Sequence, residues 1–380
     1  MLHKFKKIDP LIVTLLIVLI VIGAILQYSV GVGNTTFAFD VKKSIVIYLI
    51  SILAFVGAAY FDYRILTKVS YYLYGFGVLL LVAVYFFGSN INNARGWFQF
   101  GFLSFQPVEL MKIILIITLA AFMARRKGEP LELIRDVLPI GMLVAIPIGL
   151  VLLQPDFGNG LILAVLLVGM LWIGNIKGRF VLIGVTIIGG FTYLLLFLVN
   201  QYYAFIISFL SERKLSIQWI VRINTFINPT TADKNDSYHV DSAIRSIGSG
   251  FLTGEGYLQG TSPRTVPYAY SDSIFAVVGE EFGFVGASIL LLIYFVLIYR
   301  MILIALYCNN YAGSFIIIGI VTMLVFQIFQ NVGMMIGIMP LTGITLPFVS
   351  YGGTSLLINM VSMGLVMSIK MHDDRLLDED

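Results

Sequence analysis

The sequence predicts an all-α polytopic membrane protein with about ten transmembrane helices and one long extracellular loop between helices 7 and 8. Composition carries most of this prediction. Of the 380 residues, 59% are hydrophobic and only 12% are charged, whereas an ordinary soluble domain has about 25% charged residues. A soluble fold could not place so much apolar surface inside, so lipid must surround the chain. The second observation is a series of apolar stretches separated by short loops.

Ten apolar stretches follow one another along the chain. The sixth is short against the roughly 20 residues that a membrane helix needs, so we expect it to begin in the preceding loop. The first follows Lys4, Lys6 and Lys7 as in a signal peptide, but its length and the lack of a small-x-small cleavage site predict an uncleaved helix. The approximate limits are 10–29, 44–61, 69–88, 107–124, 137–153, 161–174, 181–200, 274–299, 313–338 and 351–370.

Lysine and arginine predict which ends of the helices face the cytoplasm, because cytoplasmic loops are enriched in both. Fourteen basic residues fall on the side of the two termini and three in the opposite short loops. The chain is therefore predicted to be a multi-pass protein of the bacterial cytoplasmic membrane with both termini cytoplasmic. The fourteen are Lys4, Lys6, Lys7, Arg64, Lys68, Arg125, Arg126, Lys127, Arg135, Lys177, Arg179, Arg300, Lys370 and Arg375; the three are Lys42, Lys43 and Arg95.

Residues 201–273 form the long loop, which this orientation places outside. Long loops cross the membrane regardless of charge, so the six basic residues in it do not oppose the assignment. The apolar and aromatic segments 202–210 and 217–227 predict amphipathic helices on the outer membrane surface. We expect residues 1–380 to form a single membrane domain with a short acidic cytoplasmic tail at about 371–380.

Several kinds of site are disfavoured by the sequence. The single cysteine, Cys308, rules out an internal disulfide, and His3, His239 and His372 are too far apart for metal-ligand spacing. No basic stripe is interleaved with aromatic residues, so no nucleic-acid partner is expected. The glycine-rich stretch 246–256 lacks the Gly-Lys-Ser/Thr ending of a phosphate-binding loop, and it predicts close backbone packing or a hinge instead.

The first polar cluster that could carry chemistry is Gln106–Lys112, at the outer start of the fourth stretch. Ionisable groups inside or beside membrane spans cost free energy, so each is a candidate for function. Glu109 and Lys112 are three residues apart on one helix face and can form an ion pair. A self-neutralising structural pair and a direct functional role fit this pattern equally well.

Two further carboxylates precede helices at the outer surface. Asp156, in the turn Gln154–Gly160, is best explained as a helix N-cap, because Asp is a preferred cap residue. Asp272 closes the long loop and opens the eighth stretch. It can cap that helix, or act as a base whose pKa and basicity are raised by desolvation at the water–lipid boundary. The spacing leaves both roles of Asp272 open.

Seven blocks of sequence together resemble the SEDS family (shape, elongation, division and sporulation), which includes the RodA, FtsW and SpoVE proteins. The resemblance covers nearly the whole chain, and the blocks occur in the family's order. The last block is very specific. The blocks are Asn93–Trp97, Phe105–Lys112, Gln154–Gly158, Ile247–Gly250, Asp272–Gly286, Asn331–Gly333 and Pro340–Gly353.

The resemblance implies a peptidoglycan glycosyltransferase that polymerises lipid II at the outer face of the cytoplasmic membrane, with a role in cell shape, elongation or division. It also implies a class B penicillin-binding protein as the partner that supplies the transpeptidase. The family's catalytic aspartate falls on Asp272. The family usually has Pro-Glu-x-His-Thr-Asp here, and this chain has Tyr268 and Tyr270 in place of Glu and His. A common Gly-Lys-Gly becomes Gly254-Glu255-Gly256.

With these roles, a sugar hydroxyl of one lipid-linked disaccharide attacks the anomeric carbon of another, and Asp272 accepts the proton as general base. Undecaprenyl diphosphate leaves, and its growing charge needs cations rather than a general acid. The supporting or substrate-binding candidates act with or without a divalent cation as cofactor. They are Arg95, Lys112, Arg222 and Arg264, together with Glu109, Trp97, Asp156, Ser350 and Tyr351.

Two other classes of protein compete with this reading. A flippase that moves the lipid-linked precursor across the membrane would suit ten helices with buried Glu109 and Lys112. Transporters, however, tend to place ionisable groups near the bilayer midplane between internal repeats, whereas these charges lie at outer helix ends. A non-catalytic scaffold that recruits the penicillin-binding protein is the third alternative.

Overall fold

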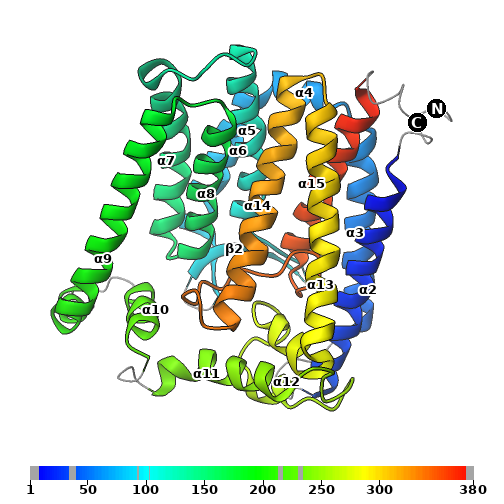
Figure 1. The fold of residues 1–380 in the computed structure, drawn as a ribbon, viewed down its shortest axis with the longest axis vertical. Helices are drawn as coiled ribbons and strands as arrows, with labels where there is room; N and C mark the ends of the chain where they lie inside the picture. The colour runs from blue at the N-terminus through cyan, green and yellow to red at the C-terminus, as the bar shows by residue number, and fades with distance from the viewer. Residues whose placement is uncertain are drawn as a thin grey trace.

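The computed structural model describes residues 8–33, 40–91, 94–101, 103–212, 217–229 and 234–373. Within them, ten apolar helices stand side by side as a bundle (Figure 1). Nine have the length and composition to cross a membrane, and α8 is a shorter apolar helix. The polytopic all-α prediction is therefore confirmed. The ten are α2 (Pro10–Gly33), α3 (Val41–Tyr60), α5 (Ser70–Phe87), α6 (Pro107–Met123), α7 (Leu138–Leu153), α8 (Phe157–Ile173), α9 (Gly178–Glu212), α13 (Ile274–Tyr307), α14 (Tyr311–Met335) and α15 (Gly353–His372).

The helix limits agree with the predicted stretches apart from their ends. As expected, α8 begins before residue 161, at Phe157. Helix α9 loses helical geometry at Tyr202 (φ −120°, ψ 25°), where the long loop was predicted to begin, but helical turns continue to Glu212. Helix α13 extends beyond residue 299 to Tyr307. Apolar residues continue past both predicted ends, so the chain remains helical there.

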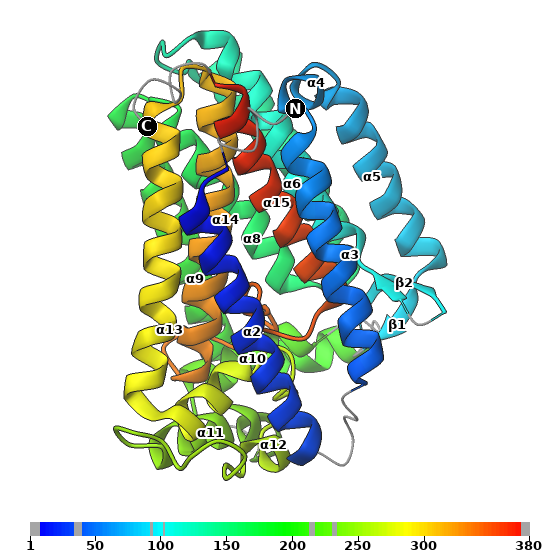
Figure 2. The same cartoon turned by 90° about the vertical axis from the view of Figure 1, so that its right-hand side faces the viewer.

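Short elements occupy the two ends of the bundle. At the end opposite to the start of α2 and the end of α15, the helices α10, α11 and α12 lie across the bundle, and a small antiparallel sheet of order β1-β2-β3 joins α5 to α6 (Figures 1 and 2). Helices are thus present inside the predicted long loop. The bounds are α4 (Tyr63–Lys68), β1 (Ser89–Ile91), β2 (Ala94–Phe100), β3 (Leu103–Phe105), η1 (Ala124–Arg126), η2 (Leu133–Val137), α10 (Gln218–Ile227), α11 (Lys234–Ser249) and α12 (Ser262–Thr265).

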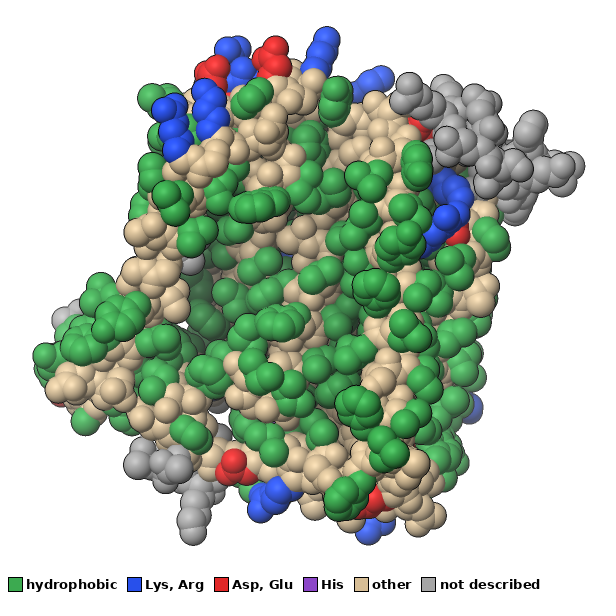
Figure 3. Space-filling view, viewed as in Figure 1, with side chains coloured by type: hydrophobic (Ala, Val, Ile, Leu, Met, Phe, Trp, Pro, Cys, Tyr) green, Lys and Arg blue, Asp and Glu red, His purple; other side chains and the backbone are tan. Residues whose placement is uncertain are grey.

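Burial is uneven across the bundle. Of the most apolar 18-residue window, 78% is buried in α6, 67% in α14 and 83% in α15, but 0% in α9. The first three helices therefore form the centre, while α9 stands at the periphery (Figure 1). The space-filling view shows hydrophobic side chains over the middle of the molecule and charged side chains gathered at its two ends (Figure 3). This is the surface expected of a protein that crosses a bilayer.

The glycine-rich stretch 246–256 packs its backbone directly on the start of α13. A Cβ atom on Gly250 would lie 1.9 Å from the Gly279 carbonyl oxygen, and one on Gly254 would lie 2.2 Å from that of Glu281. Gly254 and Gly283 also have positive φ angles, of 86° and 61°, which favour glycine. The predicted close backbone packing of this stretch is confirmed.

A buried charge cluster joins the first, eighth and last long helices at the opposite end of the bundle. The Asp9 side chain, just before α2, is 0% exposed. One of its oxygens accepts hydrogen bonds from Arg300 Nε at 2.7 Å and from Lys370 Nζ at 3.0 Å. Burial disfavours the charged carboxylate, but these cations and the bonds they donate prevail and lower the pKa of Asp9.

Candidate active site

Asp272 lies in the turn that precedes α13. It does not cap that helix: α13 begins at Ile274, its N-cap position is Ser273, and no side chain makes a cap hydrogen bond there. The Asp272 carboxylate instead accepts a hydrogen bond from Ser271 Oγ at 3.0 Å. The cap role considered for Asp272 is therefore wrong, because the helix starts one residue too late for it.

Asn331 of α14 fixes the backbone at Asp272. Its side-chain nitrogen donates to the carbonyl oxygens of Asp272 and Ile344, each at 2.7 Å. Beside Ile344, Gly343 has a φ of +75°, and a Cβ atom there would lie 3.8 Å from the Asp272 carboxylate. The segment Pro340–Gly353, which carries the most specific sequence block, therefore lies directly against this aspartate.

Ser350 and Tyr351 hold the same turn from a second direction. Ser350 Oγ donates to the Ser271 carbonyl oxygen at 2.5 Å, and the Tyr351 backbone N–H donates to that of Tyr270 at 2.9 Å. The rings of Tyr270 and Tyr351 meet edge to face, with centroids 6.2 Å apart. Both candidates thus lie against the turn that carries Asp272.

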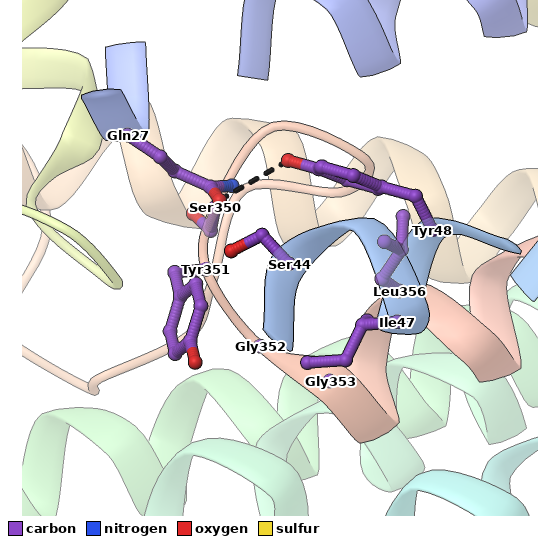
Figure 4. A pocket seen from close by; sticks show the side chains of 9 residues that line it. All are labelled: Gln27, Ser44, Ile47, Tyr48, Ser350, Tyr351, Gly352, Gly353 and Leu356. Atoms are coloured by element: carbon purple, nitrogen blue, oxygen red, sulfur yellow. Dashed lines mark hydrogen bonds between the residues drawn. The ribbon is translucent and has the colours of Figure 1, made fainter. Parts of the chain in front are cut away.

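The segment with Ser350 and Tyr351 is in turn supported by α2 and α3. Gln27 of α2 donates to the Val349 carbonyl oxygen at 2.9 Å and accepts from Tyr48 of α3 at 3.1 Å. Figure 4 shows these side chains around the turn. A Cβ atom on Gly23 would lie 2.9 Å from the Val349 oxygen, so α2 packs tightly on this segment. The first helices of the chain therefore position residues near the candidate base.

A cavity of about 520 Å³ lies beside this turn, between α10, α11 and the segment 337–341. Most of its lining is apolar, and Arg222 and His239 are the basic side chains among the lining residues. Both act electrostatically on Asp272. The lining residues are Ile217, Gln218, Val221, Arg222, Thr225, Phe226, Pro229, Ser237, His239, Val240, Asp241, Ile244, Gly337, Met339, Pro340 and Leu341.

The electrostatic setting favours a basic carboxylate. Burial raises the pKa of Asp272, because a low dielectric disfavours its charged form. His239, the Ser271 hydroxyl and Arg222 oppose this shift without cancelling it. A carboxylate with a raised pKa is a stronger proton acceptor, which is the property that a general base needs.

Glu109 and Lys112 form the predicted ion pair at the start of α6. Lys112 Nζ lies 2.8 Å from Glu109 Oε1, and the two side chains are 0% and 7% exposed. Lys112 also donates to Asn159 Oδ1 of α8 at 3.2 Å. The pair is therefore buried, neutral overall and tied to a second helix.

Asp156 caps α8 as predicted. It accepts a hydrogen bond from the Asn159 backbone at 3.1 Å, and its other oxygen accepts from the side chains of Asn159 at 2.8 Å and Gln106 at 3.0 Å. The cap thereby joins the hydrogen-bond network of Lys112. A Cβ atom on Gly158 would lie 2.6 Å from the Thr342 oxygen, so the start of α8 packs on the same segment that contacts Asp272 through Gly343.

The remaining candidates lie farther out. Arg95 is exposed on β2, next to the partly buried Trp97, and Arg264 is exposed on α12. Arg222 Nη1 lies 3.5 Å from the Leu341 carbonyl oxygen. Over the described part of the chain, no three or more His, Cys, Asp or Glu side chains are grouped to hold a metal ion.

The sequence reasoning missed two residues of this site. Asn331 stood inside a matched block, but nothing in its spacing connected it to Asp272. His239 was considered only as a metal ligand and set aside. It is 33 positions before Asp272, and only the crossing of α11 over the end of the bundle brings the two together (Figure 1).

Comparisons with known proteins agree with this architecture. The family model described as "Cell cycle protein" (FtsW, RodA and SpoVE) matches residues 7–375. Stage V sporulation protein E of Bacillus subtilis is 29% identical over 379 residues, covering 97% of this chain and 98% of the relative. Peptidoglycan glycosyltransferase MrdB of Escherichia coli K12 is 30% identical over 366 residues, covering 96% and 94%.

Solved structures show the same fold. A chain from work on the structural coordination of polymerization and crosslinking by a peptidoglycan synthase complex superposes with a TM-score of 0.75 at 28% identity, covering 96% of this chain and 97% of the other. The rod shape determining protein RodA of Thermus thermophilus superposes with a TM-score of 0.67 at 26% identity, covering 96% of both chains.

Proposed function

Because the chain belongs to the FtsW, RodA and SpoVE family of cell cycle proteins, we propose that it is a peptidoglycan glycosyltransferase. In this proposal it polymerises lipid II into glycan strands at the outer face of the cytoplasmic membrane. Relatives that carry the name peptidoglycan glycosyltransferase, such as MrdB of Escherichia coli K12, align with 96% of the chain. The proposal therefore concerns a complete fold rather than a fragment of one.

The observation that carries the proposal is the setting of Asp272. This half-buried carboxylate sits on a turn held by Asn331 and Ser350, beside a cavity of about 520 Å³. A fixed carboxylate beside a mostly apolar cavity can receive a proton from a bound hydroxyl group, since positioning and a raised pKa both favour the transfer.

The reaction follows from this geometry. The attacking sugar hydroxyl of one lipid-linked disaccharide forms a bond to the anomeric carbon of another, and its proton passes to the Asp272 carboxylate. The bond from that carbon to the diphosphate breaks, and the electron pair leaves with undecaprenyl diphosphate. A nearby carboxylate also stabilises the positive charge that develops on the sugar.

Arg222 is the cation best placed for the leaving diphosphate. It lines the cavity and acts electrostatically on Asp272, whereas Lys112 is buried against Glu109. A cation that faces a cavity can stabilise developing phosphate charge. The charge of Lys112 is already balanced within the protein, so its contribution is to hold α6 and α8 in place.

The orientation is part of the proposal. The excess of lysine and arginine on the side of the two termini puts α10–α12 and Asp272 outside. With Cys308→Ala as background, a cysteine placed by Thr253→Cys should react with a membrane-impermeant thiol reagent in intact cells. One placed by Glu129→Cys, at the opposite end, should react only after lysis. The reverse pattern would leave Asp272 on the wrong side for this function.

A class B penicillin-binding protein is the proposed partner. A solved chain with a TM-score of 0.75 belongs to a peptidoglycan synthase complex in which polymerization and crosslinking are coordinated. Crosslinking requires a transpeptidase, and in this chain only a site suited to glycosyl transfer stands out among the described residues. The partner would supply the second activity.

The direct test is purified protein, with and without a class B penicillin-binding protein, given labelled lipid II. Glycan strands of increasing length are the expected product. Movement of lipid II between leaflets without strands would identify a flippase, and neither outcome would identify a scaffold. Both of these results contradict the proposed function.

A further inference from the structure

His239 contacts the turn of Asp272 on both sides of the aspartate. Its Nε2 lies 2.7 Å from Ser273 Oγ, immediately after Asp272. On the other side, its ring forms a hydrogen bond with the backbone of Pro267 and lies 6.1 Å, centroid to centroid, from the ring of Tyr268. One side chain from α11 therefore spans the segment 267–273.

These contacts complete the support of the turn. Asn331 holds Asp272 from α14, and Ser350 holds the preceding residue from the segment before α15. His239 approaches from α11, which lies across the end of the bundle (Figure 1). It is also the support that borders the cavity, so it links the position of the base to the space where substrate is proposed to bind.

The charges around the imidazole are few. Asp272 faces it from the turn, Arg222 faces it from α10, and Asp241 lines the same cavity from α11. Burial lowers the pKa of His239 and raises that of Asp272, while attraction between the two opposes both shifts. The two groups therefore compete for a proton in the same range of pH.

We propose that His239 is a positioning residue for Asp272, which holds the turn in place and keeps the carboxylate ionised by taking up the first proton as the pH falls. This inference rests on the proposed function, because it assigns His239 a part in the same reaction. His239 accepts no proton from the sugar; it acts through Asp272.

The test uses the full chain and labelled lipid II. In His239→Ala we expect kcat to fall about tenfold to a hundredfold, the scale of a misplaced catalytic group. In His239→Gln, an amide that can still bond to Ser273 should recover much of this rate. In both variants the acidic limb of the pH–rate profile should move to higher pH, because nothing then competes with Asp272 for the proton.

Tyr238→Phe is the matched control. It removes a hydrogen bond of 2.9 Å from α11 to the Thr265 backbone without touching the 267–273 segment, so rate and profile should stay as in the unchanged chain. The inference is overturned if both His239 variants keep the acidic limb in place, whatever their rates, since a purely structural role predicts that result. Should His239→Ala fail to fold, His239→Gln decides alone. If the unchanged chain makes no strands, the proposed function fails first.

Discussion

Asp272 and Lys112 are both charged groups at the outer end of the bundle, but the protein holds them in opposite ways. Lys112 lies on a regular helix, and its counter-charge Glu109 is three residues away. Asp272 lies on an irregular turn, and its supports come from α11, α14 and the segment before α15. The first charge is neutralised at close range, and the second keeps its free capacity for a proton.

The difference separates two uses of a costly group. A buried ion pair satisfies itself and cannot exchange protons without leaving an unpaired charge. A carboxylate held through its backbone stays available at the cavity. We therefore expect substitutions of Asp272 to change activity and substitutions of Lys112 to change stability.

The largest effect is expected for Asp272→Asn. Asparagine keeps the size of the side chain and can still accept from Ser271, but it cannot take a proton. Strand formation from labelled lipid II should fall by about a hundredfold or more, the scale of losing a general base. The thermal unfolding temperature should stay close to that of the unchanged chain.

Asp272→Glu is the companion variant. Its carboxylate is displaced by one carbon, so it should recover little activity, because proton transfer depends on position. Near-normal strand formation by Asp272→Asn would remove the contrast between the two regions and move attention to Glu109 or Asp156.

The next effect concerns the ion pair. Lys112→Met keeps most of the volume but leaves Glu109 buried without a counter-charge, which should lower the free energy of unfolding by about 3 kcal/mol. The double variant with Glu109→Gln should lose less than the sum of the two single losses. Thermal unfolding in detergent measures both, with Lys127→Met on the exposed opposite end as control.

Strict additivity would show that the two side chains do not interact. A double variant that folds well but makes no strands would break the comparison in another way, since it would give the pair a direct part in the reaction.

The smallest effect is expected for Asn331→Ala, which sharpens the comparison by loosening the turn without touching the carboxylate. Two buried hydrogen bonds to carbonyl oxygens are lost, at about 1 kcal/mol each. Activity should fall about tenfold, since the base is then less well positioned. Gln327→Ala, a buried amide one turn earlier on α14, should keep normal activity. Equal losses in both variants would show that α14 matters only as packing.

The same contrast explains what the sequence could predict. Glu109 and Lys112 were paired correctly because helix geometry alone brings residues three apart together. The cap at Asp156 was predicted for a similar local reason. The apolar stretches gave the bundle, because each needs only its own composition to be recognised.

Contacts between distant segments were out of reach. The supports of Asp272 come from residues 34 to 79 positions away from their partners, and no periodicity encodes such distances. His239 was misjudged for this reason: it was compared with other histidines in sequence, while its partners are a serine and an aspartate in space. The exact start of α13 decided against the cap at Asp272, and helix ends are poorly marked in apolar sequence.

The cluster of Asp9, Arg300 and Lys370 has a consequence for how the protein is made. Synthesis places Asp9 in the nascent chain first, Arg300 late and Lys370 almost last. Until α15 has been inserted, the carboxylate that seals this end lacks one of its two cations, and an incompletely paired buried charge is costly. The cluster thus closes only when translation is nearly finished. A chain truncated before α15 would leave that end open to water and to proteases, so the same contact that fastens the bundle also distinguishes a finished molecule from an unfinished one.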